Sequence, residues 1–376
     1  MAGIESNKVI RLSKSCLNDS EKQAVMGVLD REFLGMGDEV RQFEEGLSIF
    51  FGRTAICVST GTAALHLALQ ASGVGLGDEV LVQSLTYVAS FQAISATGAT
   101  PIACEVNPTT LCIDLNNAKT KITSNTKAIM PVHYAGGVGN LDEIYTFAKE
   151  NHLKVIEDAA HAFGTTYKGK KVGSFGNVSC FSFDGIKNLT SGEGGCIVTD
   201  NQEVLNKVKD ARLLGVENDT EKRFSRQRSW SFNVIEQGWR YHMSNIMAAI
   251  GIEQLKKIDC IVYKRRELVF RYEDKLRGVT GIKTIVSLSE GVAPHIYVTV
   301  LDKGIDRDKV RNRLLKDGVE TGIHYTPNHL HTLYKSHTEL PITEELYERL
   351  LTLPLHPDLS FNDIDYIVGR VLKAIR

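Results

Sequence analysis

Between residues 55 and about 200, short apolar runs that favour β structure alternate with helical patterns. Each run is β-branched or aromatic in character and is bounded by glycine, aspartate or asparagine. The runs lie at 80–82, 128–132, 155–156, 178–183 and 196–198. Strands that are buried on both faces have this character. The alternation therefore predicts a parallel sheet wrapped by helices, which is an α/β fold.

The helix expected after Asn140 indicates where this sheet presents polar side chains. Asn140 is a suitable N-cap for a helix whose apolar face is Leu141, Ile144 and Ala148. That helix ends before the next strand, which leaves Asp158 at the carboxyl end of the strand. In open α/β sheets this end faces the ligand crevice.

The pattern changes after residue 245 to long, charged, amphipathic helices, expected at 254–276 and 306–317. A β-like run at 296–300 lies between them, which suggests a second domain of α+β type. No linker rich in proline, glycine or serine marks the boundary. The expected domains are 1–250 and 251–376.

Charge and hydropathy exclude several classes of protein. Lysine and arginine total 44 against 45 for aspartate and glutamate, so no overall basic field draws the chain to nucleic acid or anionic lipid. No apolar window approaches the roughly 18 residues of a membrane span, and the N-terminus lacks a secretory signal. The seven cysteines form no C-x-x-C pair and fit neither a disulfide framework nor a zinc site. We expect a cytoplasmic protein with no nucleic-acid or membrane partner.

Three groups with complementary chemistry are expected at one edge of the sheet. Asp158 ends one strand, while Ser182 and Lys187 lie at and after the end of a later strand. The segment 59–65, Ser-Thr-Gly-Thr-Ala-Ala-Leu, is a small-residue turn that opens a helix, whose free N–H groups and dipole bind phosphate. An anion site, a carboxylate and an amine are the parts that a pyridoxal 5'-phosphate site requires.

The chemistry of this cofactor assigns two catalytic roles. The uncharged amine of Lys187 would form the Schiff base with the aldehyde of the cofactor. The anionic Asp158 would keep the pyridine nitrogen protonated, so that electrons from the substrate carbon drain into the ring. When released, Lys187 would carry the proton between the substrate and cofactor carbons as general acid and base.

The remaining cofactor contacts follow from the same arrangement. Ser182 and the amides of Thr62 and Ala63 would bind the phosphate. Tyr87 would lie on the ring face, and His161 would approach the ring from the strand side.

Each of these residues also has a purely structural interpretation. Asp158 could cap a turn, Lys187 could be a solvated charge, and Tyr87 and His161 could be core residues. Only their joint arrangement favours the cofactor site. The glycines at 136–139 lack the G-x-G-x-x-G spacing, and there is no Walker A motif, which excludes those classes of nucleotide-cofactor enzyme.

The sequence resembles the DegT/DnrJ/EryC1/StrS sugar aminotransferases, which are fold-type I pyridoxal-phosphate enzymes of the aspartate aminotransferase-like kind. The segments that carry the resemblance span nearly the whole chain: 37–44, 59–65, 77–80, 131–136, 157–161, 182–183 with 187–188, 192–195, 248–250 with 254–255, and 324–329. The resemblance implies a large cofactor-binding domain with a mostly parallel central sheet and a smaller C-terminal α+β domain.

The resemblance implies the same cofactor roles for the residues named above. Lys187 is the Schiff-base lysine, whereas dehydratase relatives carry histidine there, so the resemblance favours amino transfer. His324, Tyr325 and His329 are implied to line the sugar pocket. A metal site at His324, His329 and His331 is not favoured, because no carboxylate lies at ligand spacing within the cluster.

The function implied is transfer of an amino group from L-glutamate to a nucleotide-linked 4-keto-6-deoxy sugar, with pyridoxamine 5'-phosphate as the intermediate form of the cofactor. The product would serve surface polysaccharide synthesis, such as O-antigen in lipopolysaccharide. A 3-keto sugar acceptor and a non-catalytic cofactor-binding regulator are the alternatives.

The resemblance also implies a homodimer with its active sites at the interface. The segment 238–243, Gly-Trp-Arg-Tyr-His-Met, departs from the usual family pattern, in which it lends a polar side chain to the phosphate site of the neighbouring subunit. Arg240 is suited to phosphate by its planar fork, but solvent and the pyrophosphate of the sugar nucleotide are equal alternatives. No role is assigned to His242.

Overall fold

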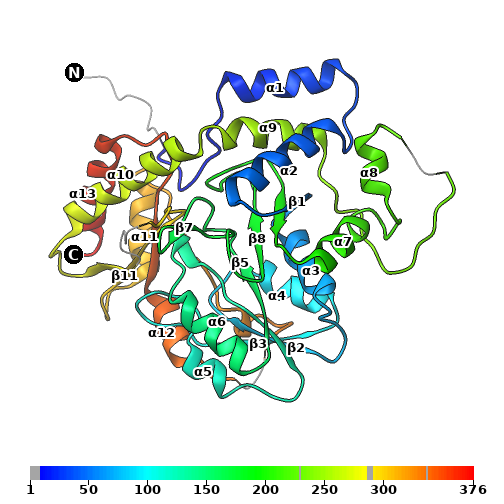
Figure 1. Cartoon of the computed structure of the whole chain (residues 1–376). Helices are drawn as coiled ribbons and strands as arrows, with labels where there is room; N and C mark the ends of the chain where they lie inside the picture. The colour runs from blue at the N-terminus through cyan, green and yellow to red at the C-terminus, as the bar shows by residue number, and fades with distance from the viewer. Residues whose placement is uncertain (1–8, 228–229, 286–290, 336–337) are drawn as a thin grey trace.

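A seven-stranded sheet forms the centre of the computed structural model, which describes residues 9–227, 230–285, 291–335 and 338–376 (Figure 1). In their order across the sheet the strands are β1 (Ala55–Val58), β9 (Gly195–Val198), β8 (Val178–Ser182), β5 (Lys154–Asp158), β4 (Thr126–Met130), β2 (Glu79–Gln83) and β3 (Thr100–Cys104). β9 runs antiparallel to β1 and β8, while the other neighbouring pairs are parallel. The expected mostly parallel sheet is confirmed.

Helices cover both faces of this sheet, and each face has its own apolar core. The helices of this part are α1 (Asp19–Asp30), α2 (Asp38–Phe51), α3 (Gly61–Ala71), α4 (Ala89–Ala96), α5 (Leu115–Lys119), α6 (Leu141–Glu150), α7 (Gln202–Ala211), α8 (Asp219–Phe224) and α9 (Asn245–Leu255), with a short 3₁₀ helix η1 (Tyr134–Gly136). One core joins the sheet to α2, α6 and α9, and the other joins it to α3, α4 and α7. A hairpin of β6 (Thr166–Tyr167) and β7 (Lys170–Lys171) completes this part.

Helix α6 confirms the expectation drawn from its cap and its apolar spacing. The side chain of Asn140 accepts a hydrogen bond from the backbone N–H of Glu143, and Leu141, Ile144 and Ala148 are buried. The chain then enters β5, which ends at Asp158.

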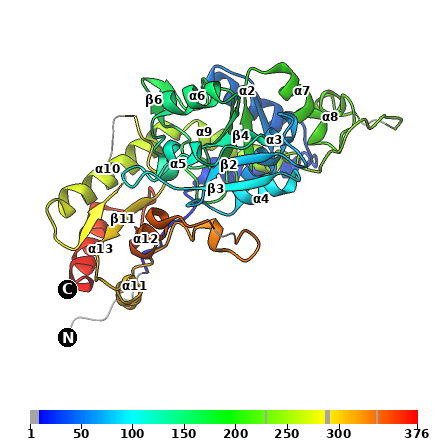
Figure 2. The same ribbon diagram turned by 90° about the horizontal axis from the view of Figure 1, so that it is seen from below.

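The C-terminal part contains a second, smaller sheet. Its antiparallel strands are β10 (Ile282–Thr284), β11 (Tyr297–Leu301) and β12 (Leu350–Leu353), and its helices are α10 (Ile258–Leu276), α11 (Arg307–Lys316), α12 (Pro341–Arg349) and α13 (Phe361–Ala374), with η2 (Asn328–Leu330). Helices α10, α11 and α13 share one apolar core with this sheet. Figure 2 shows this part beside the large sheet and its helices.

The helix expected over 254–276 is divided in the structure. α9 ends at Leu255 and α10 begins at Ile258, because Lys257 leaves the helical region with φ −108° and ψ 0°. α9 packs against α1 and α2, whereas α10 packs against α13. The boundary near residue 250 stays a prediction.

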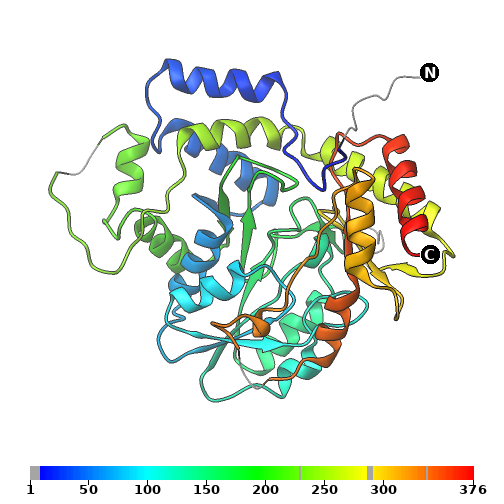
Figure 3. The ribbon, with the colours of Figure 1, turned by 180° about the vertical axis from the view of Figure 1, so that it is seen from behind.

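A long connection between β11 and β12 returns to the large sheet, and Figure 3 shows its orange segment lying across that sheet. The backbone N–H of Asn328 donates to the carbonyl of Ser84, just after β2, at 2.9 Å. Tyr325 packs against a core that Leu85 and Tyr134 share with β11. This connection brings residues 324–329 to the carboxyl ends of the parallel strands.

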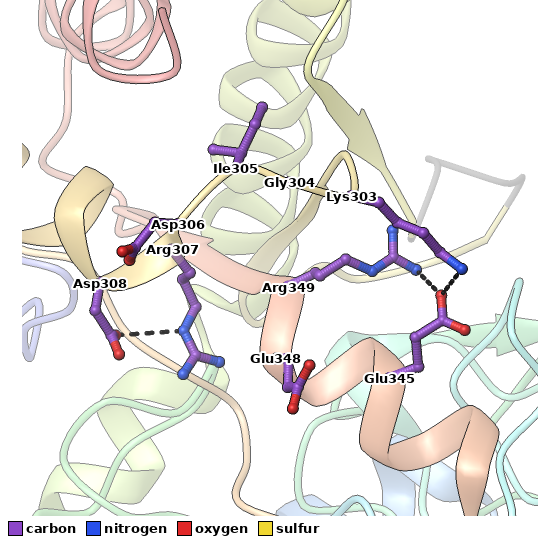
Figure 4. A pocket seen from close by; sticks show the side chains of 9 residues that line it. All are labelled: Lys303, Gly304, Ile305, Asp306, Arg307, Asp308, Glu345, Glu348 and Arg349. Atoms are coloured by element: carbon purple, nitrogen blue, oxygen red, sulfur yellow. Dashed lines mark hydrogen bonds and ion pairs between the residues drawn. The ribbon is translucent and has the colours of Figure 1, made fainter.

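A charged pocket of about 450 Å³ lies in the C-terminal part, between the start of α11 and the end of α12 (Figure 4). Glu345 accepts from Lys303 at 3.1 Å and from Arg349 at 2.8 Å. These three charged side chains of the pocket therefore pair with one another. None of the residues expected to bind the cofactor lines it.

Across the described residues, no helix combines the length and the apolar character that crossing a bilayer requires.

Candidate active site

The ends of two neighbouring parallel strands bring the expected catalytic groups together. Asp158 is the last residue of β5 and Ser182 the last of β8, and the two strands pair with Asp158 opposite Cys180. Lys187 follows in the turn after β8, where its backbone N–H donates to the carbonyl of Asp184 at 3.0 Å. The structure therefore places the carboxylate, the hydroxyl and the amine at one edge of the sheet, as expected.

The carboxylate of Asp158 is buried and held by two hydrogen-bond donors. Ser90 Oγ donates to Oδ2 at 2.7 Å, and the backbone N–H of Ala160 donates to Oδ1 at 3.2 Å. Ser90 Oγ also lies 3.0 Å from Thr86 Oγ1. Because a buried charge requires such partners, these contacts fix the direction in which Asp158 faces.

The amine of Lys187 is tuned toward its uncharged form. Burial lowers the pKa of Lys187 to about 8, and the charge of Arg265 acts in the same direction, while Asp184 and Asp158 oppose it. A lysine with its ordinary pKa of 10.5 would be almost entirely protonated at neutral pH. The lowered pKa makes a substantial fraction of the amine available as a nucleophile.

The first turn of α3 and Ser182 form a cradle suited to an anion. A Cβ on Gly61 would lie 2.7 Å from Cβ of Ser182, so only glycine lets the helix begin this close to the strand end. Thr60 caps α3, because its side-chain oxygen accepts from the N–H of Ala63 at 3.0 Å. The N–H of Ala63, which was expected to bind the phosphate, therefore already has a partner inside the protein. The N–H groups of Gly61 and Thr62 lie in the first turn, where no intrahelical carbonyl accepts from them. Amides of a helix N-terminus beside a hydroxyl are suited to the cofactor phosphate.

Three ring side chains lie next to one another at the same edge. The exposed Tyr87 has its ring centroid 5.6 Å from that of Tyr325, whose hydroxyl is 3.0 Å from Nε2 of His161. Nδ1 of His161 accepts from the N–H of Ala135 at 3.3 Å, so Nε2 carries the proton of the neutral ring and donates to Tyr325. Burial, and then the charge of Lys187, hold the pKa of His161 well below its usual value.

The residues expected in the sugar pocket fall into two separate networks. His324 Nδ1 lies 2.8 Å from Thr352 Oγ1, and burial together with the Lys187 charge lowers the pKa of His324 to about 4. His324 and Tyr325 therefore belong to the surroundings of Lys187. His329 is buried elsewhere, with Nδ1 2.7 Å from Ser84 Oγ and Nε2 3.0 Å from the carboxylate of Glu344.

Both ring nitrogens of His329 thus have protein partners, and its contact with a sugar stays a prediction. Within the parts of the chain that the structure describes, no group of three or more histidine, cysteine or acidic side chains is arranged to hold a metal ion.

Arg240 precedes Tyr241, whose carbonyl accepts from the N–H of Ser59 just before the cradle. Arg240 is exposed, and its backbone pairs with Leu213. The neighbouring His242 pairs with Val58 at the end of β1, and burial followed by the charges of Arg223 and Arg240 lowers the pKa of His242 to about 4. The assignment of Arg240 to a phosphate site stays a prediction.

Two residues of the site were missed by the sequence analysis. Ser90 binds Asp158, and its signal was a hydroxyl in the first turn of the helix that follows β2 at the same sheet edge. His295, whose Nε2 lies 3.3 Å from Nζ of Lys187, directly precedes the β-like run at 296–300. Nothing local in the sequence distinguishes it from a structural histidine.

A model of the DegT/DnrJ/EryC1/StrS aminotransferase family matches residues 15–372. The chain belongs to this family. The family is dependent on pyridoxal 5'-phosphate, and membership makes the chain a transaminase of the fold-type I class. The cradle at Gly61, the buried Asp158 and the tuned Lys187 fit that cofactor.

Similar proteins cover almost the full length of the chain. SpsC, the spore coat polysaccharide biosynthesis protein of Bacillus subtilis (strain 168), is 34% identical over 381 residues, which is 98% of each chain. PseC of Helicobacter pylori, an aminotransferase involved in the biosynthesis of pseudoaminic acid, has a TM-score of 0.91 at 28% identity, over 98% of this chain and 99% of the other.

A third similar structure bears on the cofactor. Spr1654 of Streptococcus pneumoniae in its PMP form has a TM-score of 0.91 at 29% identity, over 97% of this chain and 99% of the other. It has also been solved in a PLP form.

Proposed function

We propose that the enzyme transfers the amino group of L-glutamate to a nucleotide-linked 4-keto-6-deoxy sugar. The product would be a nucleotide-linked 4-amino-4,6-dideoxy sugar for a surface polysaccharide such as the O-antigen of lipopolysaccharide. The observation that carries the reaction type is the Lys187 amine, which lies at the same sheet edge as Asp158 and the anion cradle. Its pKa is lowered to about 8. A role in the biosynthesis of sugars and polysaccharides is supported by the descriptions of SpsC and PseC, while the 4-keto-6-deoxy acceptor rests on the resemblance of the sequence.

The residues of the chain divide the chemistry among them. When bound, pyridoxal 5'-phosphate supplies an electron-accepting ring. Asp158, oriented by Ser90, holds a proton on the ring nitrogen. Lys187 would hold the cofactor through its uncharged amine and, when free, would move the substrate proton. Ser182 and the free N–H groups of the first turn of α3, that of Thr62 among them, would hold the phosphate, and the N–H of Ala63 would join them where it leaves the side chain of Thr60.

The groups around Tyr325 are proposed to receive the sugar. Tyr87, which packs against Tyr325, would cover the cofactor ring, and His161, which contacts the hydroxyl of Tyr325, would approach the ring from the strand side. His324 lies in the same neighbourhood, and its neutral ring offers a hydrogen bond without a charge. His329 is proposed to shape the sugar pocket by holding its own loop against Ser84.

The proposal includes a cytoplasmic homodimer whose two sites lie at the interface. Four apolar side chains are exposed on the segment that extends away from the large sheet after α8 (Figure 2): Trp230, Phe232, Val234 and Ile235. Apolar surface of this kind is typical of a contact with another chain. The exposed Arg240 follows on the same stretch and is proposed to reach the cofactor phosphate of the neighbouring subunit.

A spectral titration tests this function. The enzyme is converted to its pyridoxamine form with L-glutamate, the keto acid is removed, and nucleotide-linked 4-keto and 3-keto sugars are added one at a time. Recovery of the original cofactor absorbance with a 4-keto sugar is the expected result. Recovery with a 3-keto sugar alone would replace the acceptor, and absence of any change with glutamate would favour a non-catalytic cofactor-binding regulator.

A further inference from the structure

His295 makes a direct contact with the reactive atom of Lys187. Nε2 of His295 lies 3.3 Å from Nζ of Lys187, and the imidazole is almost fully buried, with 2% of its surface exposed. The two residues are 108 positions apart in the chain, because His295 precedes β11 in the C-terminal part. The proposed function does not use this histidine.

The backbone on both sides of the His295 ring is anchored. Its N–H donates to the carbonyl of Ala135 at 3.1 Å, and its own carbonyl accepts from Nη1 of Arg265 at 3.0 Å. Arg265 is itself buried on α10 and also donates to the carbonyl of Leu355 at 3.2 Å. The backbone that carries the imidazole is therefore fixed between η1 and α10, so the ring stays beside Lys187.

The surroundings of His295 keep its ring neutral. The groups that face it are all basic: Lys187, His161, Arg265 and His324. Burial, followed by the charge of Lys187, holds the pKa of His295 well below its usual value. The acids that act on Lys187 itself are Asp184 and Asp158.

The hydrogen-bond roles follow from the chemistry of the two groups. An ammonium group only donates, so Nε2 of the neutral ring is the acceptor when Lys187 is charged, and the ring proton lies on Nδ1. Nδ1 is buried and has no hydrogen-bond partner among the described residues. Buried polar atoms normally have a hydrogen-bond partner, so leaving Nδ1 without one costs stability. The contact of Nε2 with Lys187 gives this ring a function that offsets the cost.

We propose that His295 is the positioning partner of Lys187, whose amine it holds at a fixed place by a hydrogen bond whenever that amine is not bound to the cofactor. This inference rests on the proposed transaminase chemistry, in which Lys187 alternates between a bound and a free state. A carboxylate at this place would also hold the amine, but it would favour the charged ammonium. A neutral imidazole holds the amine and leaves it able to lose its proton.

The test measures the pKa of Lys187 in the enzyme loaded with pyridoxamine 5'-phosphate, in which the lysine is free. Acetic anhydride labels Lys187 at a series of pH values, and mass spectrometry gives the extent of labelling. For His295→Glu we expect the pKa of Lys187 to rise by about 1 or more. For His295→Gln, which retains a neutral acceptor, we expect the wild-type value, and for His295→Leu a value lower by about 0.5.

His356→Leu is the matched control, because His356 is also buried, its pKa is also lowered, and its Nδ1 also lacks a partner among the described residues. We expect it to leave the pKa of Lys187 unchanged. If His295→Glu does not fold, the difference between the Gln and Leu variants decides. Equal pKa values in all folded His295 variants, or an equal shift in His356→Leu, would overturn the inference. Failure of glutamate to change the cofactor spectrum would instead reject the proposed function, since the labelling does not depend on the amino donor.

Discussion

Ser90 Oγ donates a hydrogen bond of 2.7 Å to Oδ2 of Asp158, and both side chains are buried. Ser90 belongs to α4, which follows β2, whereas Asp158 ends β5, so the contact joins the carboxyl ends of two separated strands. The proposed function assigns Asp158 to the ring nitrogen of the cofactor. Ser90 then determines which oxygen of the carboxylate remains for that nitrogen.

Replacing Ser90 by alanine is expected to weaken cofactor binding without unfolding the protein. A hydrogen bond to a charged group contributes roughly 1.5–3 kcal/mol, so we expect the Kd for pyridoxal 5'-phosphate to rise about ten- to a hundredfold. Absorbance titration of the stripped enzyme measures it. Ser95→Ala, on the same helix, is the control, because Ser95 Oγ donates a weak hydrogen bond of 3.4 Å to Tyr334 and does not contact Asp158. Equal Kd values for the two variants would contradict the role of Ser90.

Gly61→Ala is expected to damage the anion cradle by crowding alone. The added Cβ would lie 2.7 Å from Cβ of Ser182, a separation that forces the start of α3 away from the strand. We expect the Kd for the cofactor to rise about tenfold or more, because the helix amides no longer face the phosphate. Inorganic phosphate should compete with the cofactor less well in this variant.

The control for Gly61→Ala is Gly369→Ala on α13. A Cβ there would meet nothing within 4 Å. Alanine in an open helical position stabilises by about 0.5–1 kcal/mol, so thermal unfolding should occur at a slightly higher temperature with cofactor binding unchanged. Loss of binding in both variants would show that the effect at Gly61 is not local.

The sequence could predict the parts of the site that lie at strand ends. Asp158 and Ser182 end strands that the apolar runs had located, and Lys187 follows directly, so the carboxyl edge of the sheet brought them together. Neither Ser90 nor His295 was predictable in this way, because the contact of Ser90 depends on the order of the strands and that of His295 on the packing of the C-terminal part.

The same limit applies to the histidine-rich loop. His324 and His329 are five residues apart, yet one faces the surroundings of Lys187 and the other is bound between Ser84 and Glu344. In a helix or strand the spacing of two residues shows whether they share a face, but a loop has no such period, so the sequence could not separate these two environments. The predicted helix over 254–276 was wrong as one element, because an interruption of the backbone at Lys257 leaves no apolar signature in the sequence.

Lys187→Arg separates the charge of the lysine from its chemistry. Arginine keeps the positive charge but is never deprotonated in proteins, so it cannot supply an uncharged nucleophile. We expect turnover to fall by about 10³-fold or more, as with Lys187→Ala. Lys121→Arg is the matched control, because burial lowers the pKa of Lys121 as well, while its Nζ donates to the backbone carbonyl of Ala103 at 2.7 Å. Activity retained by Lys187→Arg would exclude the covalent role.

The pH dependence of cofactor attachment should follow the same lysine. Burial lowers the pKa of Lys187 from 10.5 to about 8, so the uncharged fraction rises through pH 8 and levels off above it. The rate of covalent attachment of pyridoxal 5'-phosphate to the stripped enzyme should therefore increase about tenfold for each pH unit well below 8 and become constant above about 9. Stopped-flow absorbance records it. A profile that still rises at pH 10 would indicate an ordinary lysine.

The stability of the protein without cofactor should also depend on pH, because the pKa of Lys187 is lower in the folded chain than in the unfolded chain. Between pH 8 and 10.5 the unfolded chain binds a proton at Lys187 that the folded chain does not, so the contribution of this lysine to the free energy of unfolding increases with pH. Below pH 8 the folded state carries the full cost of the buried charge, which Lys187→Met removes. We expect the Met variant to be more stable by about 3 kcal/mol at pH 7, and the difference to vanish as the pH approaches 10.5. Urea denaturation at pH 7, 8.5 and 10 measures the difference, and a gap that does not change with pH would mean that packing, and not the charge, separates the two proteins.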